Sequence, residues 1–428
     1  MGVLLSLPLG LKDEEEKKQE FTVCPKVRIR PGAVPGPTAR PGMVVGLGSG
    51  CGRGVTVAAG VPGRDGSGSR GRAEGRCRGA VRRGRRPYSR RVFRNRTSYL
   101  NLSEEQCVQR LGFSREAVTE LCLLVQAQLQ PRTRAWTALP VAVKVTVALN
   151  FYTTGSFQAA TGIINDITQF AIHCCIRDVT EVLYDKRNQF ISFPMETESQ
   201  EQRELGFRKI AGFPGVQGVL GCAHVALRAP YDNPAVYINA KGFHSLKVQL
   251  VCDHRHRVMH VCSRFPGSTC HSLILQESSV PPLFEPECRV SGWLLGSSDY
   301  PLTPWLMTPV RNPRSSGEHQ YNCRHASCHG SVRRTIAMLK HRFRCLSRSG
   351  GSLQYSPDRV SKFIVVCCML HNFALERGQV LRTSEGLQEE EWEGEECEWE
   401  EEEEEEGERS PNLITAIALQ QCIIQGFS

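Results

Sequence analysis

With 428 residues, 40% of them hydrophobic, the chain is long enough for two or three domains, and no run approaches the roughly 20 apolar residues of a membrane span. Many of its 19 cysteines lie inside apolar runs, which is typical of buried thiols in a reducing compartment and argues against a secreted disulfide framework. Fifteen of the 44 acidic residues lie between Glu389 and Glu408 without a Lys or Arg, so the rest has 53 basic against 29 acidic residues. That excess favours DNA or RNA as partner over a basic body kept soluble by an acidic tail.

Residues 1–95 are predicted to form a disordered leader rich in Gly, Arg and Pro. From residue 24 to about 90 there is almost no periodic apolar pattern, so the segment cannot bury enough surface to offset the entropy of ordering it. The stretch from Arg70 to Arg96 is especially basic. It is interpreted either as a nuclear-import signal or phosphate-contacting arm, or as an unselected Gly/Arg tract.

Residues 96–200 are predicted to be helical. A capping box, Ser103-Glu-Glu-Gln106, predicts a first helix, and a second is expected from Ser114 to the break at Pro131. A third helix is expected from Leu139, with Pro140 in its first turn. A short helix over 155–162 and a long one over 167–183, capped by Asp166, then predict a helix-turn-helix.

In such a motif the second helix enters the major groove of DNA and presents its first turns to the bases. The candidates for base contacts are Thr168, Gln169 and His173, and Arg177 is a candidate for a phosphate contact. The same helix contains Phe170 and other apolar residues, so an ordinary helical-bundle core is the alternative interpretation.

Residues 201–380 change to strand patterns and then return to helices. Strands are expected over 216–222, in a hairpin of 244–253 and 258–264, and in two short buried runs, 293–296 and 305–308. Helices are expected over 325–343 and 357–375. This order predicts a mixed α/β sheet covered by helices on both faces. Residues 381–428 are expected to be an acidic tail that ends in a helix over 413–424.

Five segments resemble the PIF/Harbinger transposases, most closely the Harbinger transposase-derived nuclease family. They are Gly218–His224, Tyr237–Leu246, Trp293–Leu302, Lys340–Leu346 and Cys367–Asn372. The resemblance covers roughly residues 95–380 and implies an RNase H-like fold in 201–380 behind a helix-turn-helix. It also implies a nuclear DNA-binding protein, which could also occur in the cytoplasm, a Myb/SANT-like accessory partner, and no small-molecule substrate.

The same resemblance implies a nuclease with two Mg²⁺ or Mn²⁺ ions held by clustered carboxylates. Where the family has Asp or Glu, this chain has Gly221, His271, Ser297 and Arg333. Glycine offers no ligand, serine only a neutral hydroxyl, histidine an imidazole better suited to Zn²⁺, and arginine a permanent positive charge. We therefore expect that the metal is not bound and that hydrolysis is lost.

Two alternatives stay open. Asp299, two residues beyond Ser297, is a possible substitute ligand for an active endonuclease, and a protein-interaction scaffold is the third reading. The close spacing of Cys323, His325, Cys328 and His329 is compatible with a zinc site, although core or surface roles are commoner for such residues. A basic helix is interpreted as phosphate-binding or as an ordinary solvated face, and its residues are Arg333, Arg334, Lys340, Arg342 and Arg344.

Overall fold

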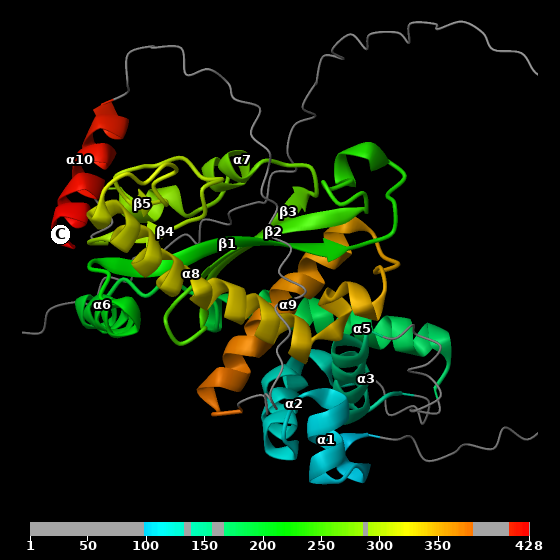
Figure 1. The fold of residues 1–428 in the computed structure, drawn as a ribbon. Coiled ribbons are helices and arrows are strands. Elements are labelled where there is room, and N and C mark those ends of the chain that lie inside the picture. Colours follow the sequence, from blue (N-terminus) through cyan, green and yellow to red (C-terminus); the bar gives the residue numbers. More distant parts are fainter. Residues whose placement is uncertain (1–97, 132–137, 156–166, 286–289, 380–410, 428) are drawn as a thin grey trace, which may run out of the picture. The chain divides into compact units, whose positions relative to one another are not determined.

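The computed structural model describes residues 98–131, 138–155, 167–285, 290–379 and 411–427 (Figure 1). The leader up to residue 97, the stretch of 156–166 that holds the first helix of the expected helix-turn-helix, and the acidic run of 389–408 lie outside these ranges. The expectations for those segments therefore stay predictions.

A five-stranded mixed sheet forms the centre of the structure. Its strands are β1 (Val216–Ala226), β2 (Ser245–Cys252), β3 (Val258–Pro266), β4 (Trp293–Leu295) and β5 (Leu306–Met307). They are arranged in the order β3-β2-β1-β4-β5. Strand β2 runs antiparallel to both β1 and β3, whereas β4 runs parallel to β1 and β5 runs parallel to β4. The mixed α/β sheet and the hairpin expected from the sequence are thus confirmed.

Helices cover both faces of this sheet, and Figure 1 shows the two sides. On one side lie α8 (Ser316–Arg342) and α9 (Pro357–Glu376), and α6 (Thr197–Ala211) packs against β1 and α8. On the other side lies the short α7 (His271–Gln276), over a smaller apolar cluster that includes residues of β1, β2 and β4. The last helix, α10 (Pro411–Gln425), packs on α8.

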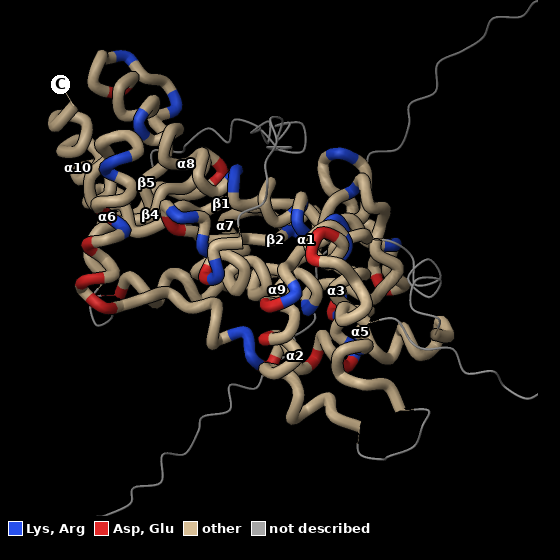
Figure 2. The backbone as a smooth tube through the Cα atoms, turned by 90° about the horizontal axis from the view of Figure 1, so that it is seen from below, with Lys and Arg blue, Asp and Glu red and all other residues tan. Residues whose placement is uncertain are grey.

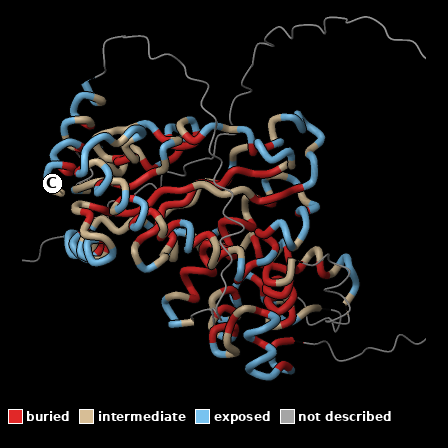
Figure 3. Tube along the Cα trace, viewed as in Figure 1, coloured by how far each residue is buried: buried red, intermediate tan, exposed pale blue. Residues whose placement is uncertain are grey.

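The amino-terminal helices share the larger core with α8 and α9. They are α1 (Glu104–Leu111), α2 (Arg115–Leu129), α3 (Val141–Thr154) and α5 (Gln169–Asp185). Helix α5 contacts α2, α3 and α9, so the helical region is joined to the sheet through α9. Figure 3 shows buried residues running through the sheet and along α9 and α3.

Short 3-10 turns link several of these elements. They cover Tyr99–Asn101, Arg187–Gln189, Pro234–Tyr237, Pro281–Phe284, Arg344–Leu346 and Arg348–Gly350. No helix within the described ranges is long and apolar enough to cross a membrane.

Several helix boundaries differ from the sequence-based expectations because of their caps. Helix α8 begins at Ser316 rather than near residue 325, since Ser315 forms a capping box with Glu318 that the sequence analysis missed. Helix α5 begins at Gln169, and the Thr168 hydroxyl accepts a hydrogen bond from the amide of Ala171. The expected cap, Asp166, lies outside the described residues. Helices α6 and α7 were not predicted.

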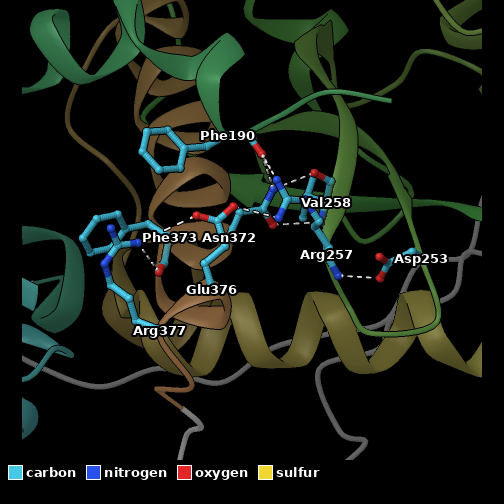
Figure 4. A network of polar contacts seen from close by, with 8 residues as sticks. All are labelled: Phe190, Asp253, Arg257, Val258, Asn372, Phe373, Glu376 and Arg377. Carbon is cyan, nitrogen blue, oxygen red and sulfur yellow. Dashed lines mark hydrogen bonds and ion pairs between the residues drawn. The ribbon is translucent and has the colours of Figure 1, made fainter. Parts of the chain in front are cut away.

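The carboxyl-terminal half of α9 is fastened to β3, an edge strand of the sheet (Figure 4). The side chain of Asn372, fully buried, accepts a hydrogen bond from the amide of Val258 at 2.9 Å and donates to its carbonyl at 2.7 Å. It also donates to the carbonyl of Phe190 at 3.0 Å. The Leu-His-Asn part of the resembled motif is therefore a structural fastening, in which a side-chain amide satisfies the backbone of an edge strand.

Candidate functional site

Two of the four positions at which the resemblance implies a carboxylate lie on a strand, or just beyond one, in a neighbouring parallel pair. Strand β1 pairs with β4 so that Val219 is opposite Leu295. Continuing this register for two residues places Gly221 beside Ser297, just beyond the end of β4. The carboxyl ends of parallel strands are where α/β sheets commonly place functional groups.

Helix α8 covers Gly221 and brings the third position to the same region. A Cβ atom added to Gly221 would lie 2.9 Å from Cγ1 of Val332 and 3.0 Å from its Cγ2. Arg333 follows Val332 on this helix and is exposed. The structure therefore brings Gly221, Ser297 and Arg333 to one region of the sheet, with a valine filling the space in front of the glycine.

His271 begins α7 and reaches the same region from the other face. Its Nδ1 lies 3.8 Å from Oδ2 of Asp299, and its ring packs edge-on against Tyr300. The hydroxyl of Ser297 donates to the same oxygen of Asp299 at 3.1 Å. The side chains of His271 and Asp299 are only 8% and 12% exposed. The Asp299 carboxylate thus accepts from Ser297 and lies against His271, two of the positions at which the resemblance implies a carboxylate.

A buried polar chain continues from this cluster into the sheet. Sγ of Cys222 lies 3.1 Å from the hydroxyl of Tyr300, which donates to Oε1 of Gln249 at 3.3 Å. Burial raises the pKa of Cys222 to about 12, so its thiol stays protonated and is neither a nucleophile nor a metal-binding thiolate. Sequence reasoning did not assign Cys222 or Tyr300. Successive side chains of a strand point to opposite faces. The sequence therefore places Cys222 on the face of the sheet opposite to Gly221, away from the expected ligands.

The residues in this region do not fit a two-metal site. Mg²⁺ requires several oxygen ligands in octahedral geometry, and two such ions require clustered carboxylates. Among the residues that the structure describes, no group of three or more His, Cys, Asp or Glu side chains is placed to hold a metal ion. Val332 fills the space beside Gly221, and Arg333 adds a positive charge.

The four residues of the zinc hypothesis do not converge either. His325 lies 3.2 Å from the carbonyl of Met307, and His329 lies 3.0 Å from that of Leu220, so each imidazole is used inside the core. Burial lowers the pKa of His325 to about 3 and that of His329 to about 4. Cys328 is buried, and its thiol donates to the carbonyl of Phe207. Cys323 is exposed. The zinc interpretation is therefore wrong, and the core alternative holds for three of the four.

The five basic candidates on α8 and in the turn after it fall into two groups, those that are exposed or half-buried and one that is buried. Arg333, Arg334 and Arg344 are exposed and Lys340 is half-buried, so these stay candidates for phosphate contacts. Arg342 is only 4% exposed and donates to the carbonyls of Gly112 and Gln379. Burial lowers its pKa to about 10. The predicted phosphate contact of Arg342 is wrong, because this side chain ties α8 to the α1–α2 turn and to the end of α9.

The candidates on α5 are spread along its first turns. Thr168 uses its hydroxyl as the N-cap, and Gln169 is exposed. Nε2 of His173 lies 3.3 Å from a guanidinium nitrogen of Arg359, on α9. Arg177 is paired with Asp178 at 2.8 Å. Because the expected first helix of the motif lies outside the described residues, the helix-turn-helix is not tested by these positions.

Comparison with known proteins identifies the scaffold that carries this region. Residues 220–372 match the family model described as DDE superfamily endonuclease. The chain is 40% identical over 278 residues to "Putative nuclease HARBI1" of Homo sapiens, an alignment that covers 65% of this chain and 80% of the relative.

Other similar proteins extend from amphibians to plants. The Xenopus laevis protein of the same name is 37% identical over 297 residues, covering 69% of this chain and 85% of the relative. "Protein ALP1-like" of Arabidopsis thaliana is 24% identical over 286 residues, covering 61% and 69%. No solved structure matches the chain. The human and amphibian identities, over most of each relative, show that the chain belongs to the Harbinger transposase-derived nuclease family.

Proposed function

We propose that this chain is a nuclear nucleic-acid-binding protein built on a nuclease scaffold that no longer hydrolyses phosphodiesters. The observation that carries the proposal is the region around Gly221. Two strand positions and one helix position that supply the family's carboxylates instead carry Gly221, Ser297 and Arg333. Asp299, the carboxylate beside them, accepts a hydrogen bond from Ser297 and lies against His271.

Nucleic-acid binding is favoured by the family and by charge. Nucleic acid is the substrate class that membership of a nuclease family implies. The chain outside the acidic run has a large excess of basic residues, and α8 exposes Arg333 and Arg334 next to the altered site. An arginine can neutralise a phosphate by direct hydrogen bonding, which retains binding without the metal that hydrolysis needs.

The same proposal includes an RNase H-like fold, a helix-turn-helix and an accessory partner protein. The order β3-β2-β1-β4-β5, with β4 and β5 parallel to β1, supports an RNase H-like sheet. The helix-turn-helix rests on the resemblance, and α5 corresponds to its expected second helix. The Myb/SANT-like accessory partner rests on the resemblance alone.

A plasmid-nicking assay tests the loss of hydrolysis. Supercoiled DNA is incubated with the full chain and Mg²⁺ or Mn²⁺, in parallel with Asp299→Asn. We expect no nicking above the protein-free control from either protein, together with retention of labelled duplex DNA in a filter-binding titration. Nicking by the wild-type chain that disappears in Asp299→Asn would refute the proposal, because this result requires a working metal site.

A restored variant tests the physical reason for the loss. The changes Gly221→Asp, Ser297→Asp and Arg333→Glu return three of the four carboxylates that the resemblance implies, but the carboxylate at 221 needs the room that Val332 occupies. The variant Gly221→Asp, Ser297→Asp, Arg333→Glu should therefore gain little, and adding Val332→Ala should raise Mn²⁺-dependent nicking. Equal activity of the two variants would show that the packing of Val332 is irrelevant.

One observation keeps an active endonuclease as a second candidate function. His271 and Asp299 are close together, nearly buried, and adjacent to Ser297. A single metal ion held by Asp299 with non-standard ligands would make nicking depend on both side chains. The paired variants Asp299→Asn and His271→Gln would then lose activity together.

A further inference from the structure

A shallow cleft between α5 and α9 gathers basic side chains from both helices. Its walls include His173, Arg177 and Glu181 from α5 and Arg359 and Lys362 from α9. The two helices are packed against each other in the core below it. The free volume is about 10 Å³, room for roughly one water-sized sphere, so the cleft accommodates a single atom of a ligand and no whole small molecule.

The positively charged side chains of this cleft differ in whether a carboxylate neutralises them. Arg177 is paired with Asp178, and Lys362 is paired with Glu181. Arg359 forms no ion pair with a carboxylate of the described residues, and one of its guanidinium nitrogens lies 3.3 Å from Nε2 of His173. Because a guanidinium only donates, the ring nitrogen facing it accepts and is unprotonated. The cleft therefore carries one excess positive charge, at Arg359.

The excess at Arg359 lies among side chains of both signs, since Asp178 and Glu181 are close by. Figure 2 shows Lys and Arg interspersed with Asp and Glu along the described chain. Burial and the nearby charges of Arg359 and Arg177 lower the pKa of His173, which keeps the ring neutral near pH 7. The guanidinium of Arg359 has five N–H donors and the neutral ring of His173 accepts from only one of its nitrogens, so Arg359 keeps donors for an anion.

We propose that the cleft between α5 and α9 binds a backbone phosphate of nucleic acid, with Arg359 as the principal contact and Arg177 beside it. One non-bridging oxygen enters the cleft, and the rest of the phosphate stays at the surface. A guanidinium fork matches the geometry of phosphate oxygens, and the contact carries no sequence information. The inference rests on the proposed nucleic-acid binding and adds Arg359, on α9, to the phosphate contact that the sequence predicts at Arg177.

The test measures duplex affinity for the full chain and four variants. Two labelled duplexes of unrelated sequence are titrated at several salt concentrations with wild type, Arg359→Gln, Arg359→Lys, Arg177→Gln and Arg314→Gln. Arg314 is an exposed arginine before α8 and serves as the control for removal of one charge away from the cleft. The thermal midpoint of each variant is measured alongside.

We expect Arg359→Gln to weaken binding roughly tenfold on both duplexes and to lower the salt slope by about 0.9. Arg359→Lys should weaken it less, because the charge remains while the fork is lost. Arg177→Gln, on an exposed side chain, supplies the same test if Arg359→Gln unfolds. Arg314→Gln should keep nearly wild-type affinity.

The outcomes separate this contact from the function on which it rests. A wild-type chain that retains no duplex at low salt overturns both. Wild-type binding with Arg359→Gln and Arg177→Gln each equal to Arg314→Gln overturns the cleft and leaves nucleic-acid binding standing. A loss on one duplex only would also overturn the proposal, since a phosphate contact weakens all sequences alike.

Discussion

Replacement of Asn372 by leucine should be one of the most destabilising single changes in this chain. The two side chains have similar volumes, so packing is nearly kept, while three hydrogen bonds to backbone groups are lost. Val258 is fully buried, which leaves its amide and carbonyl without this partner in a dry environment. At about 2 kcal/mol for each unsatisfied buried group, the free energy of unfolding should fall by roughly 4 kcal/mol. Phe190 is half-buried, so water can replace the third bond.

Asn322 provides a matched control for this substitution. Its side-chain amide makes the same reciprocal pair with the amide and carbonyl of Val310, at 2.9 and 2.8 Å, but it is only half-buried. Urea unfolding of Asn322→Leu should therefore show a loss of about 1 kcal/mol, because water can reach the freed groups. Equal losses for Asn322→Leu and Asn372→Leu, or a loss under 1 kcal/mol at Asn372, would refute the argument that burial makes this fastening important.

Three further predictions concern buried or half-buried side chains away from the cleft. Arg342→Met should lower the free energy of unfolding by about 3 kcal/mol, since two charge-assisted bonds are lost, and should leave duplex affinity unchanged in the filter-binding titration. The low pKa values of His325 and His329 mean that the unfolded chain binds their protons first, so stability should fall as pH drops below about 6.5. In urea titrations between pH 6 and 5, His329→Gln should reduce the pH slope of stability by about 1.4 kcal/mol per unit relative to wild type. Phe427→Ala removes the ring that packs on Phe213 and under Arg324, and should raise amide hydrogen exchange in α10 without changing that of β1.

The sheet could be predicted from the sequence because its signals are local. The hairpin of β2 and β3 follows from two apolar runs about a turn at Asp253, and the strand at Trp293 from a buried run. The caps at Ser103 and Ser114 likewise fixed the starts of α1 and α2. Helix α6 was missed because its charged sequence buries only a few positions, among them Gln200, Arg203 and Phe207.

The sequence could not predict which basic residues and which candidate metal ligands are buried, because burial depends on the tertiary structure. Arg342 and Arg344 are two residues apart in the chain, yet one is almost fully buried and the other is exposed. Spacing alone made Cys323 and His325 equivalent candidates for a metal, whereas the fold directs the histidine into the core. The contact between His173 and Arg359 joins residues 186 positions apart, which no periodicity reveals.

Gly221 and its neighbours Val332 and Arg333 on α8 are physically coupled, which bears on whether the proposed site could gain hydrolysis. Once position 221 has no side chain, Val332 can pack directly against β1, and that contact contributes to the core. An aspartate restored there must displace the valine or be buried against it, and a buried carboxylate without partners is costly. Arg333 on the next position of α8 would attract such a carboxylate while repelling the cation that should bind it. Restoring the carboxylates therefore works against the packing of Val332, and this explains why the triple variant should gain little activity when Val332 is unchanged.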